Sequence, residues 1–303
     1  MNVAAVDCGS NSTRLLIMDA NGSVMARELR ITRLSAGVDA TGRLDTAALE
    51  RTLTVIDEYR SRWQVAGVTD RVRIAATSAV RDAANREEFF DGVRRLTGVE
   101  AEVLSGDDEA RLSFAGAVGA VDVPFPTAVV DIGGGSTELV MGDSAGVLGA
   151  CSMQLGSVRI TERHMHADPP SGGQVAAARR LIREALAQAD AGVGGPGFGA
   201  AAALVGVAGT VTTLAALDLG LDGYDPDLIH GSRMTRQDVK AWTERLLSMS
   251  THERAVQPAI QAGREDVIHA GALILAEVMD RYGFDEVVVS EADILDGLAA
   301  SLR

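Results

Sequence analysis

The chain of 303 residues carries a formal net charge of −14, because its 42 Asp and Glu residues outnumber its 28 Lys and Arg residues. A nucleic-acid-binding protein normally presents a basic surface, so this balance argues against that class. The length suffices for two domains with separate cores, and no apolar stretch is long enough to cross a bilayer. The N-terminus carries no recognisable secretory signal, so we expect a cytoplasmic protein. Cys8 and Cys151 are expected to be buried thiols without a chemical role.

The first predicted element is an apolar strand that ends in a carboxylate and then turns back. Residues 3–19 read VAAVDCGSNSTRLLIMD, with Asp7 at the end of the strand and Gly9 in the turn. Glycine leaves backbone N–H groups open to a ligand, and such groups in a tight turn form an anion-binding concavity that suits phosphate. The Asn-Gly pair at 21–22 predicts a hairpin into a third strand.

A helix is expected over 45–62, with Asp45 as its N-cap, and a strand over 71–81. Ligands of open α/β sheets bind at the carboxyl ends of strands, so Arg81 is placed to reach a phosphate. A solvated surface arginine is the alternative for this residue. The polar residues at the end of the strand are Thr77, Ser78 and Arg81. The next predicted elements are a helix over 85–96 and a strand over 99–106.

A further helix is predicted over 107–121, and it opens with three carboxylates. Acidic side chains in a first turn are favoured by the helix dipole, and this role accounts for Asp107 and Asp108. Adjacent residues of a helix point in different directions, so at most one or two of the three can face a substrate. Glu109 is therefore the candidate for chemistry.

A second copy of the strand–turn–strand pattern begins 124 residues after the first. Residues 127–143 read TAVVDIGGGSTELVMGD, so that Asp131 aligns with Asp7. Asp131 and Glu138 flank the glycines and would repel phosphate unless a divalent cation lay between them, and oxygen ligands point to Mg²⁺. A plain glycine-rich hairpin is the alternative for one isolated copy. The repeat of the pattern favours a duplicated domain instead.

The duplication predicts two similar α/β domains, 1–125 and 126–303, joined at the proline-containing segment 121–127. The last helix is a candidate to pack back on the first domain. Two phosphate loops on two similar domains are expected to face each other across a cleft that holds one polyphosphate chain.

The second half continues with helices and a third polar turn. Residues 203–217 predict a buried strand, a turn over 206–210 and a helix. That turn suits a nucleotide, a sugar or more phosphate, and close strand–helix packing is the alternative. The other predicted elements are helices over 156–165, 174–191, 236–249 and 263–282, a loop over 192–199, a strand over 286–293 and a short final helix.

Four motifs carry a resemblance to known proteins. VDCGSNST, DIGGGSTE and VAGTVTT, in this order, resemble the acetate kinase–sugar kinase–Hsp70–actin superfamily. SGDDEARLSFAG followed by VVDIGGGSTELV resembles, more narrowly, the Ppx/GppA family of exopolyphosphatases and guanosine pentaphosphate phosphohydrolases. The resemblance covers essentially the whole chain and implies two ribonuclease H-like domains, a duplicated actin-like ATPase fold with an inter-domain cleft.

The resemblance also implies roles for individual residues. Glu109 matches the catalytic glutamate, and Arg81 is expected to contribute a positive contact to the substrate. The implied metal ligands are Asp131 and Glu138. The implied phosphate-binding residues are Ser10, Asn11, Ser12, Thr77, Ser78, Gly133, Gly134, Gly135 and Ser136, to which Gly209 and Thr210 of the third turn are added. Cys8 stands where the family usually has an aliphatic residue.

The function expected from these observations is Mg²⁺-dependent release of terminal phosphate from inorganic polyphosphate by an exopolyphosphatase. Longer relatives carry extra helical domains, so short chains are the expected substrate. The nearest alternative is hydrolysis of the 5′ phosphate of guanosine pentaphosphate (pppGpp). A superfamily kinase with ATP at 206–210 and an actin-type nucleotide-dependent scaffold are further alternatives. A homodimer is expected from the resemblance alone.

Overall fold

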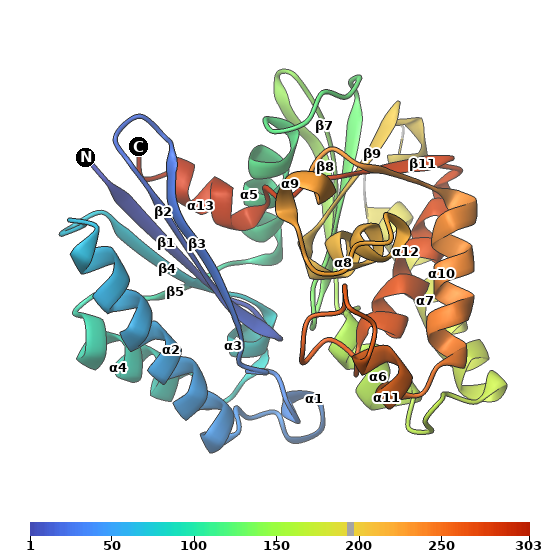
Figure 1. The fold of residues 1–303 in the computed structure, drawn as a ribbon, viewed down its shortest axis with the longest axis horizontal. Helices are drawn as coiled ribbons and strands as arrows, with labels where there is room; N and C mark the ends of the chain where they lie inside the picture. Colours follow the sequence, from blue (N-terminus) through green and yellow to red (C-terminus); the bar gives the residue numbers. More distant parts are fainter. Residues whose placement is uncertain (193–196) are drawn as a thin grey trace. The chain divides into compact units, whose positions relative to one another are not determined.

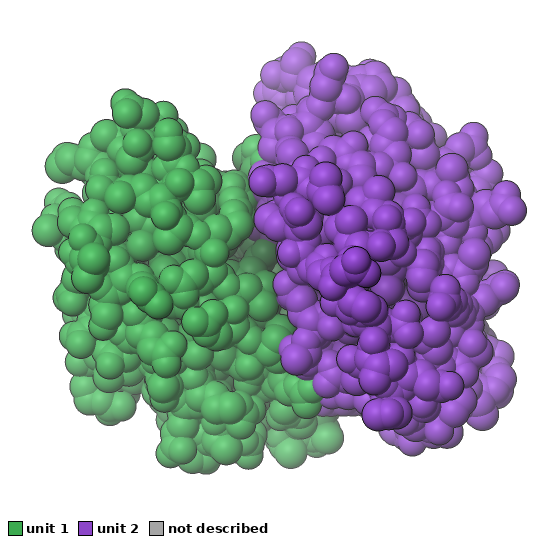
Figure 2. Space-filling model, in the orientation of Figure 1, with its two compact units in different colours: residues 1–116, 294–303 green, residues 117–293 purple. Residues whose placement is uncertain are grey.

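The computed structural model describes residues 1–192 and 197–303. The chain divides into two compact units, coloured separately in Figure 2. Unit 1 comprises Met1–Gly116 and Ile294–Arg303, and unit 2 comprises Ala117–Asp293. Relative to the sequence-based division, residues 117–125 join the second unit and residues 294–303 join the first. Residues 193–196 of the predicted loop over 192–199 lie outside the described residues, and a 3-10 helix, η1, begins at Phe198.

Unit 1 is built on a five-stranded sheet with the order β3-β2-β1-β4-β5. β1 pairs antiparallel with β2 and parallel with β4, and all six residues of β1 are buried, as befits a central strand. The strands are β1 (Val3–Cys8), β2 (Ser12–Met18), β3 (Val24–Ile31), β4 (Val72–Ala76) and β5 (Glu102–Val103).

Helices cover both faces of this sheet (Figure 1). One face packs on α2 and α4 through a cluster that includes Ile56, Tyr59 and Phe89. The other face packs on the last helix, α13, through Leu295 and Leu298. The helices of unit 1 are α1 (Val38–Thr41), α2 (Thr46–Val65), α3 (Ser78–Asp82), α4 (Arg86–Thr97), α13 (Ile294–Ala300) and α5 (Gly106–Val118), whose last two residues belong to unit 2.

Unit 2 is built on a six-stranded sheet with the order β10-β11-β9-β6-β7-β8. β6 pairs antiparallel with β7 and parallel with β9. The strands are β6 (Thr127–Ile132), β7 (Thr137–Asp143), β8 (Gly146–Met153), β9 (Ala203–Val207), β10 (Arg233–Thr235) and β11 (Glu286–Val289). Apart from the added edge strand β10, this sheet repeats the order and the strand directions of unit 1. The predicted fold class, two similar ribonuclease H-like α/β domains as in the duplicated actin-like ATPase fold, is confirmed.

The helices of unit 2 share one apolar core with its sheet, which includes Ile182, Leu214 and Leu273. Glu277 of α12 is 3% exposed and pairs with Arg183 of α7 at 2.5 Å, which joins two of these helices. The helices of unit 2 are α6 (Ser157–His164), α7 (Gly172–Gly192), η1 (Phe198–Ala200), α8 (Ala208–Asp218), α9 (Pro226–Ile229), α10 (Arg236–Ser248), α11 (Thr251–Ala255) and α12 (Ile268–Tyr282).

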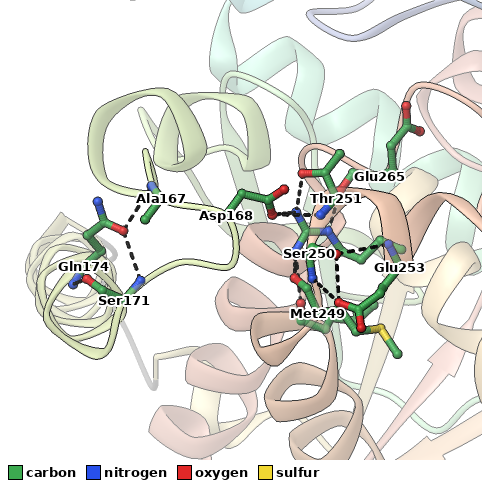
Figure 3. A network of polar contacts seen from close by, with 11 residues as sticks. Ala167, Asp168, Ser171, Gln174, Met249, Ser250, Thr251, Glu253 and Glu265 are labelled. Atoms are coloured by element: carbon green, nitrogen blue, oxygen red, sulfur yellow. Dashed lines mark hydrogen bonds and ion pairs between the residues drawn. The ribbon is translucent and has the colours of Figure 1, made fainter.

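A buried arginine ties α10, α11 and the start of α12 together. Arg254 is 2% exposed and donates to the carbonyl oxygens of Met249 and Glu265 at 2.6 Å each. Its Nη2 lies 3.6 Å from Asp168 Oδ1, which also accepts from the Thr251 amide at 2.7 Å (Figure 3). The guanidinium thus satisfies carbonyl groups beyond the end of α10 that would otherwise be buried without a donor.

Two predicted strands of unit 1 are wrong in length. The strand expected over 71–81 ends at Ala76, and Arg81 lies on the short helix α3 instead. The strand expected over 99–106 is reduced to Glu102–Val103. β4 lies inside the sheet and pairs with β1 along its whole length, and α3 begins at Ser78, directly after Thr77; the edge strand β5 pairs with β4 through Glu102 and Val103. The predicted helix over 263–282 begins at Ile268.

The search for membrane spans gave a negative result. Within the described residues, no helix combines the length and the apolar character that crossing a bilayer requires.

Candidate functional site

Residues 9–12 form the turn between β1 and β2 (turn 1). Backbone amides of the segment that follows β3 donate hydrogen bonds to carbonyl groups of this turn. Within the turn, the Gly9 amide donates to Ser12 O at 3.0 Å. The Ser10 carbonyl accepts from the Ser35 amide at 3.0 Å, and the Asn11 carbonyl accepts from the Thr32 and Arg33 amides at 3.0 and 2.9 Å. Three backbone donors thus fix the orientation of two successive peptide groups.

The turn between β6 and β7, residues 133–136 (turn 2), repeats this arrangement. The Gly133 amide donates to Ser136 O at 3.0 Å, the same bond at the same distance as in turn 1. The first turn of α6 holds the carbonyl groups: Ser157 N–H donates to Gly133 O at 3.0 Å, and Val158 N–H donates to Gly134 O at 2.9 Å. In addition, Arg159 Nε donates to Gly135 O at 2.9 Å.

The amide groups of both turns are available to a ligand. Among the residues that the structure describes, the N–H groups of Gly134 and Gly135 donate to no backbone or side-chain acceptor, and the same holds for Ser10 and Asn11. Successive unengaged N–H groups in a rigid turn make a site for an anion such as phosphate. Each unit therefore carries one turn of this geometry, built from the same backbone bonds.

A pair of carboxylates adjoins turn 2. Asp131 and Glu138 lie directly opposite each other on β6 and β7, so their side chains emerge on the same face of the sheet. They are 7% and 1% exposed, and Ser152 donates to Glu138 Oε1 at 2.7 Å. Within residues 1–192 and 197–303, no group of three or more His, Cys, Asp or Glu side chains could hold a metal ion. Two carboxylates still fit Mg²⁺, which keeps several waters and takes its other ligands from substrate phosphates.

A different pair adjoins turn 1. Asp7, the counterpart of Asp131, lies directly opposite Arg14 on β2. Arg14 Nε and Nη2 donate to Asp7 Oδ2 at 3.0 and 2.7 Å. The sequence analysis did not single out Arg14, although aligning the two copies places it at the position of Glu138.

The hydroxyl groups predicted in unit 1 meet at the carboxyl ends of β1 and β4. Ser10 Oγ and Ser78 Oγ lie 2.9 Å apart and are buried. Thr77, between β4 and α3, donates its amide to Cys8 O at 3.4 Å. The structure therefore brings the hydroxyl groups of Ser10 and Ser78 into contact and sets Thr77 beside the end of β1 through its backbone.

The two residues predicted to act in catalysis lie together as well. Arg81 of α3 donates from Nη1 to Glu109 Oε2 of α5 at 3.1 Å. Glu109 is 7% exposed, whereas Asp107 and Asp108 are exposed. The Asp108 amide and carboxylate both bond to Ser105 Oγ, which is a capping role. The structure thus separates Glu109 from its two acidic neighbours as expected.

The third predicted turn differs from the other two because α8 begins within it, at Ala208. Thr210 is 5% exposed, and its hydroxyl donates to Ile132 O at 3.4 Å, next to turn 2. A Cβ at Gly209 would overlap the guanidinium of Arg264, and one at Gly271 would overlap the Thr210 side chain. Thr210 thus contacts the strand end before turn 2 and Gly271 of α12, whereas Gly209 lies against the flexible Arg264 side chain. A role in phosphate binding stays a prediction.

Cys8 has no place in the chemistry of turn 1. The residue is fully buried, and this burial, together with the nearby Asp7 carboxylate, raises the pKa of its thiol well above the ordinary value. Cys151 is only partly buried, contrary to the prediction that both are buried.

Sequence reasoning missed Gly156, Ser157 and Arg159, which lie behind turn 2. A Cβ at Gly156 would overlap the backbone of Gly134, so only glycine lets the start of α6 approach the turn. No local sequence pattern predicts the contact between Arg159 and Gly135, since 24 residues separate them. The duplication was the one feature of the sequence that could have predicted these residues, because in unit 1 the segment after β3 also donates to the carbonyl groups of the turn.

The structure is that of two similar α/β units, each with a turn at the end of its central strand whose backbone amides suit an anion. The same fold hosts several activities, so the class alone does not select one.

Comparison with known proteins supplies the family. The model of the Ppx/GppA phosphatase family matches residues 16–302, and the chain belongs to this family of hydrolases. "Exopolyphosphatase 2" of Mycobacterium tuberculosis is 44% identical over 99% of this chain and 98% of its own length. A crystal structure of an exopolyphosphatase-like protein is 40% identical, covers 99% of this chain and 98% of that one, and superposes with a TM-score of 0.92. The Ppx/GppA enzyme of Aquifex aeolicus is 33% identical over 99% of both chains, with a TM-score of 0.82.

Proposed function

We propose that this hydrolase is an exopolyphosphatase, which releases terminal orthophosphate from linear inorganic polyphosphate with the help of Mg²⁺. The observation that carries the proposal is the pair of turns whose carbonyl groups are held and whose amide groups are unengaged among the described residues. Two turns that suit anions fit a substrate made of repeated phosphate groups. The 44% identity to a protein named exopolyphosphatase supports the same activity.

In this proposal the turns bind and orient phosphate groups. The amides of Gly134 and Gly135 and the hydroxyl of Ser136 bind one group, and turn 1 with Ser10, Asn11 and Ser12 binds another. Phosphoryl transfer requires little covalent chemistry from the protein and depends on positioning and on charge stabilisation. The hydrogen bonds behind each turn supply that positioning before the substrate arrives.

Asp131 and Glu138 would hold the Mg²⁺ ion, directly or through water. The ion supplies positive charge for the phosphate oxygens as negative charge develops on them. Without it, the two carboxylates would repel the anionic substrate, and the net charge of −14 would add to that repulsion.

Glu109 acts as the general base in this proposal. Its carboxylate accepts a proton from a water molecule, whose oxygen forms a bond to the terminal phosphorus while the bond to the bridging oxygen breaks. The shortened polyphosphate leaves with the electron pair of that bond. Arg81, which already contacts Glu109, fixes the direction of the carboxylate and offers a second terminal nitrogen to a phosphate oxygen.

The test is orthophosphate release from polyphosphates of defined length, measured beside pppGpp with the Mg²⁺ concentration varied. We expect release from polyphosphate without any acceptor, and loss of release after chelation of Mg²⁺. Release from pppGpp alone would replace the proposal with the pentaphosphate activity. Transfer only to an added hydroxyl acceptor would identify a kinase. Glu109→Gln serves as the control for contaminating phosphatases.

A homodimer and a cytoplasmic location belong to the same proposal. Light scattering at several concentrations measures the mass of the assembly, and fractionation of the source cells locates the protein. A monomeric mass at all concentrations or recovery with the membrane fraction would contradict the respective expectation.

A further inference from the structure

A four-residue segment of unit 1, residues 32–35 (the supporting segment), holds the carbonyl groups of turn 1. The amides of Thr32 and Arg33 both donate to Asn11 O, at 3.0 and 2.9 Å. The Ser35 amide donates to the preceding carbonyl oxygen of the turn at 3.0 Å. The orientation of turn 1 therefore depends on how firmly the supporting segment is itself held.

Arg51 of α2 binds the backbone of the supporting segment. Its Nε and Nη2 donate to Thr32 O at 3.3 and 3.1 Å, and among the described residues it has no other hydrogen bond or ion pair. Thr32 O and the Arg33 N–H belong to one trans peptide group, so they point in opposite directions. This peptide group thus accepts from Arg51 at one end and donates to Asn11 O at the other.

The backbone at this peptide group has an unusual conformation. Arg33 has a φ of 51°, in the left-handed region that residues with a side chain rarely adopt, because Cβ then crowds a carbonyl oxygen. Such a conformation persists where the surrounding contacts determine it. The bonds at the two ends of the peptide group are contacts of this kind, and the one from Arg51 is charge-assisted.

Other contacts fix the place of the supporting segment through its side chains. Thr32 Oγ1 and Thr13 Oγ1 lie 2.9 Å apart and are buried, and Leu34 is 0% exposed within the core shared with α2 and α4. These contacts hold side chains, whereas Arg51 holds the peptide group that faces turn 1. The direction of that peptide group therefore depends on Arg51.

We propose that Arg51 is a positioning residue of turn 1, which acts on the Asn11 carbonyl through the peptide group between Thr32 and Arg33. The positive charge of Arg51 makes the Arg33 N–H a stronger donor, because hydrogen bonds in a chain polarise one another. In unit 2, Arg159 donates directly to a carbonyl group of turn 2 at 2.9 Å, so an arginine supports each turn. For the identity of the anion that turn 1 binds, this role rests on the proposed function.

Amide hydrogen exchange, followed by mass spectrometry, tests this role in the absence of any substrate. We expect exchange in the supporting segment and in turn 1 to become about tenfold faster in Arg51→Ala, because a charge-assisted bond is lost, and Arg51→Lys to recover part of the difference. Arg62→Ala is the matched control, since Arg62 lies on the same helix and pairs with the Glu28 side chain at 3.3 Å. Equal exchange in Arg51→Ala and the wild type would overturn the proposal.

Steady-state kinetics and thermal unfolding then separate a positioning role from a purely structural one. The substrate is whichever of polyphosphate and pppGpp the wild-type chain hydrolyses. KM is expected to rise about tenfold in Arg51→Ala with a smaller change in kcat, and Arg51→Lys is expected to restore part of the loss. Faster exchange and a lower melting temperature with an unchanged KM would overturn the proposal. If the wild type hydrolyses neither substrate, the proposed function fails, and the exchange measurement alone decides the role of Arg51.

Discussion

The Arg81 guanidinium donates from Nη1 both to Glu109 Oε2 at 3.1 Å and to Leu104 O at 3.0 Å, so one nitrogen orients the carboxylate and anchors the strand end before α5. The other terminal nitrogen, Nη2, is buried and has no hydrogen-bond partner among the described residues. A buried donor without a partner costs free energy, and under the proposed function an acceptor of the substrate would remove that cost. A phosphate oxygen fits that description.

Replacing Glu109 by glutamine should lower kcat by about 10²–10⁴-fold, because the amide cannot take the proton of the attacking water. KM should change little, since the shape of the side chain and an oxygen acceptor for Arg81 remain. Orthophosphate release measured across substrate concentrations separates the two constants. Asp108→Asn is the matched control, because Asp108 is exposed and caps its helix. Equal turnover in Glu109→Gln and the wild type would exclude Glu109 as the base.

Replacing Arg159 by alanine should reduce kcat/KM by about tenfold, mainly through KM, because the variant loses a charged donor to Gly135 O that holds turn 2. Arg159→Lys should recover part of the loss. Arg180→Ala is the control, since Arg180 is an exposed residue of α7 paired with Glu184 at 3.9 Å. An unchanged KM in Arg159→Ala would show that the backbone donors of α6 suffice.

Replacing Gly156 by alanine should displace turn 2, although the backbone conformation at position 156 suits alanine. Its φ of −140° suits any residue, but the new methyl group would overlap Gly134 O. A shift of about 1 Å in a positioning element can cost about 10²-fold in rate, and we expect a fall of that order in kcat/KM. Gly173→Ala, where no atom lies within 4 Å of the new methyl group, should behave as wild type. Wild-type kinetics in Gly156→Ala would mean that α6 moves instead of the turn.

His269 should make the folded protein less stable as the pH falls. Burial, and next the nearby Arg254, lower the pKa of its imidazole to about 3. The unfolded chain binds a proton at this residue below about pH 6.5 and the folded chain does not, so stability is lost between about pH 6.5 and pH 3. The slope is about 1.4 kcal/mol per pH unit, or about 2 kcal/mol at pH 5.

The free energy of unfolding from urea titrations between pH 4.5 and 7.5 checks this expectation. His269→Gln should flatten the slope by the stated amount, whereas His166→Gln, at an exposed position, should leave it unchanged. An equal slope in His269→Gln and the wild type would refute a neutral buried imidazole.

Cys8 should resist thiol reagents in the folded protein. The side chain is fully buried, and its raised pKa keeps it protonated even at pH 9. In Cys151→Ser, Ellman's reagent should detect no thiol in buffer at pH 7.5 or 9 and one thiol in denaturant. Rapid labelling of the folded variant would contradict the burial of Cys8.

The sequence predicted the parts of the site that depend on local pattern. The strand–turn–strand pattern predicted that Asp131 and Glu138 flank the glycine turn, and the structure places them directly opposite each other on β6 and β7. Helix geometry distinguished Glu109 from Asp107 and Asp108. The expected N-cap, Asp45, accepts from the Ala48 amide at 3.0 Å. The expectation that both turns grip one substrate concerns the arrangement of the two units and stays a prediction.

The parts that the sequence did not predict depend on contacts between distant segments. Arg159 reaches turn 2 from α6, and Gly156 is required there by a backbone that lies elsewhere in the sequence. α3 was mistaken for the end of a strand because its five residues, Ser78–Asp82, are too few to show a helical pattern of apolar residues. Arg14 was overlooked for a different reason: the comparison of the two copies stopped at the residues they share.

The last helix completes a unit whose other residues come first in the chain. α13 packs on β1 and β2, Gly297 touches the backbone of Leu112, and Arg71 donates to Leu302 O at 3.0 Å. During synthesis, one face of the first sheet therefore remains uncovered while the ribosome makes all of Ala117–Asp293. At about 5–20 residues per second, the synthesis of this segment takes on the order of ten seconds or more. During this time the uncovered apolar face of the sheet is accessible to chaperones. The second unit can therefore complete its folding before the first unit does.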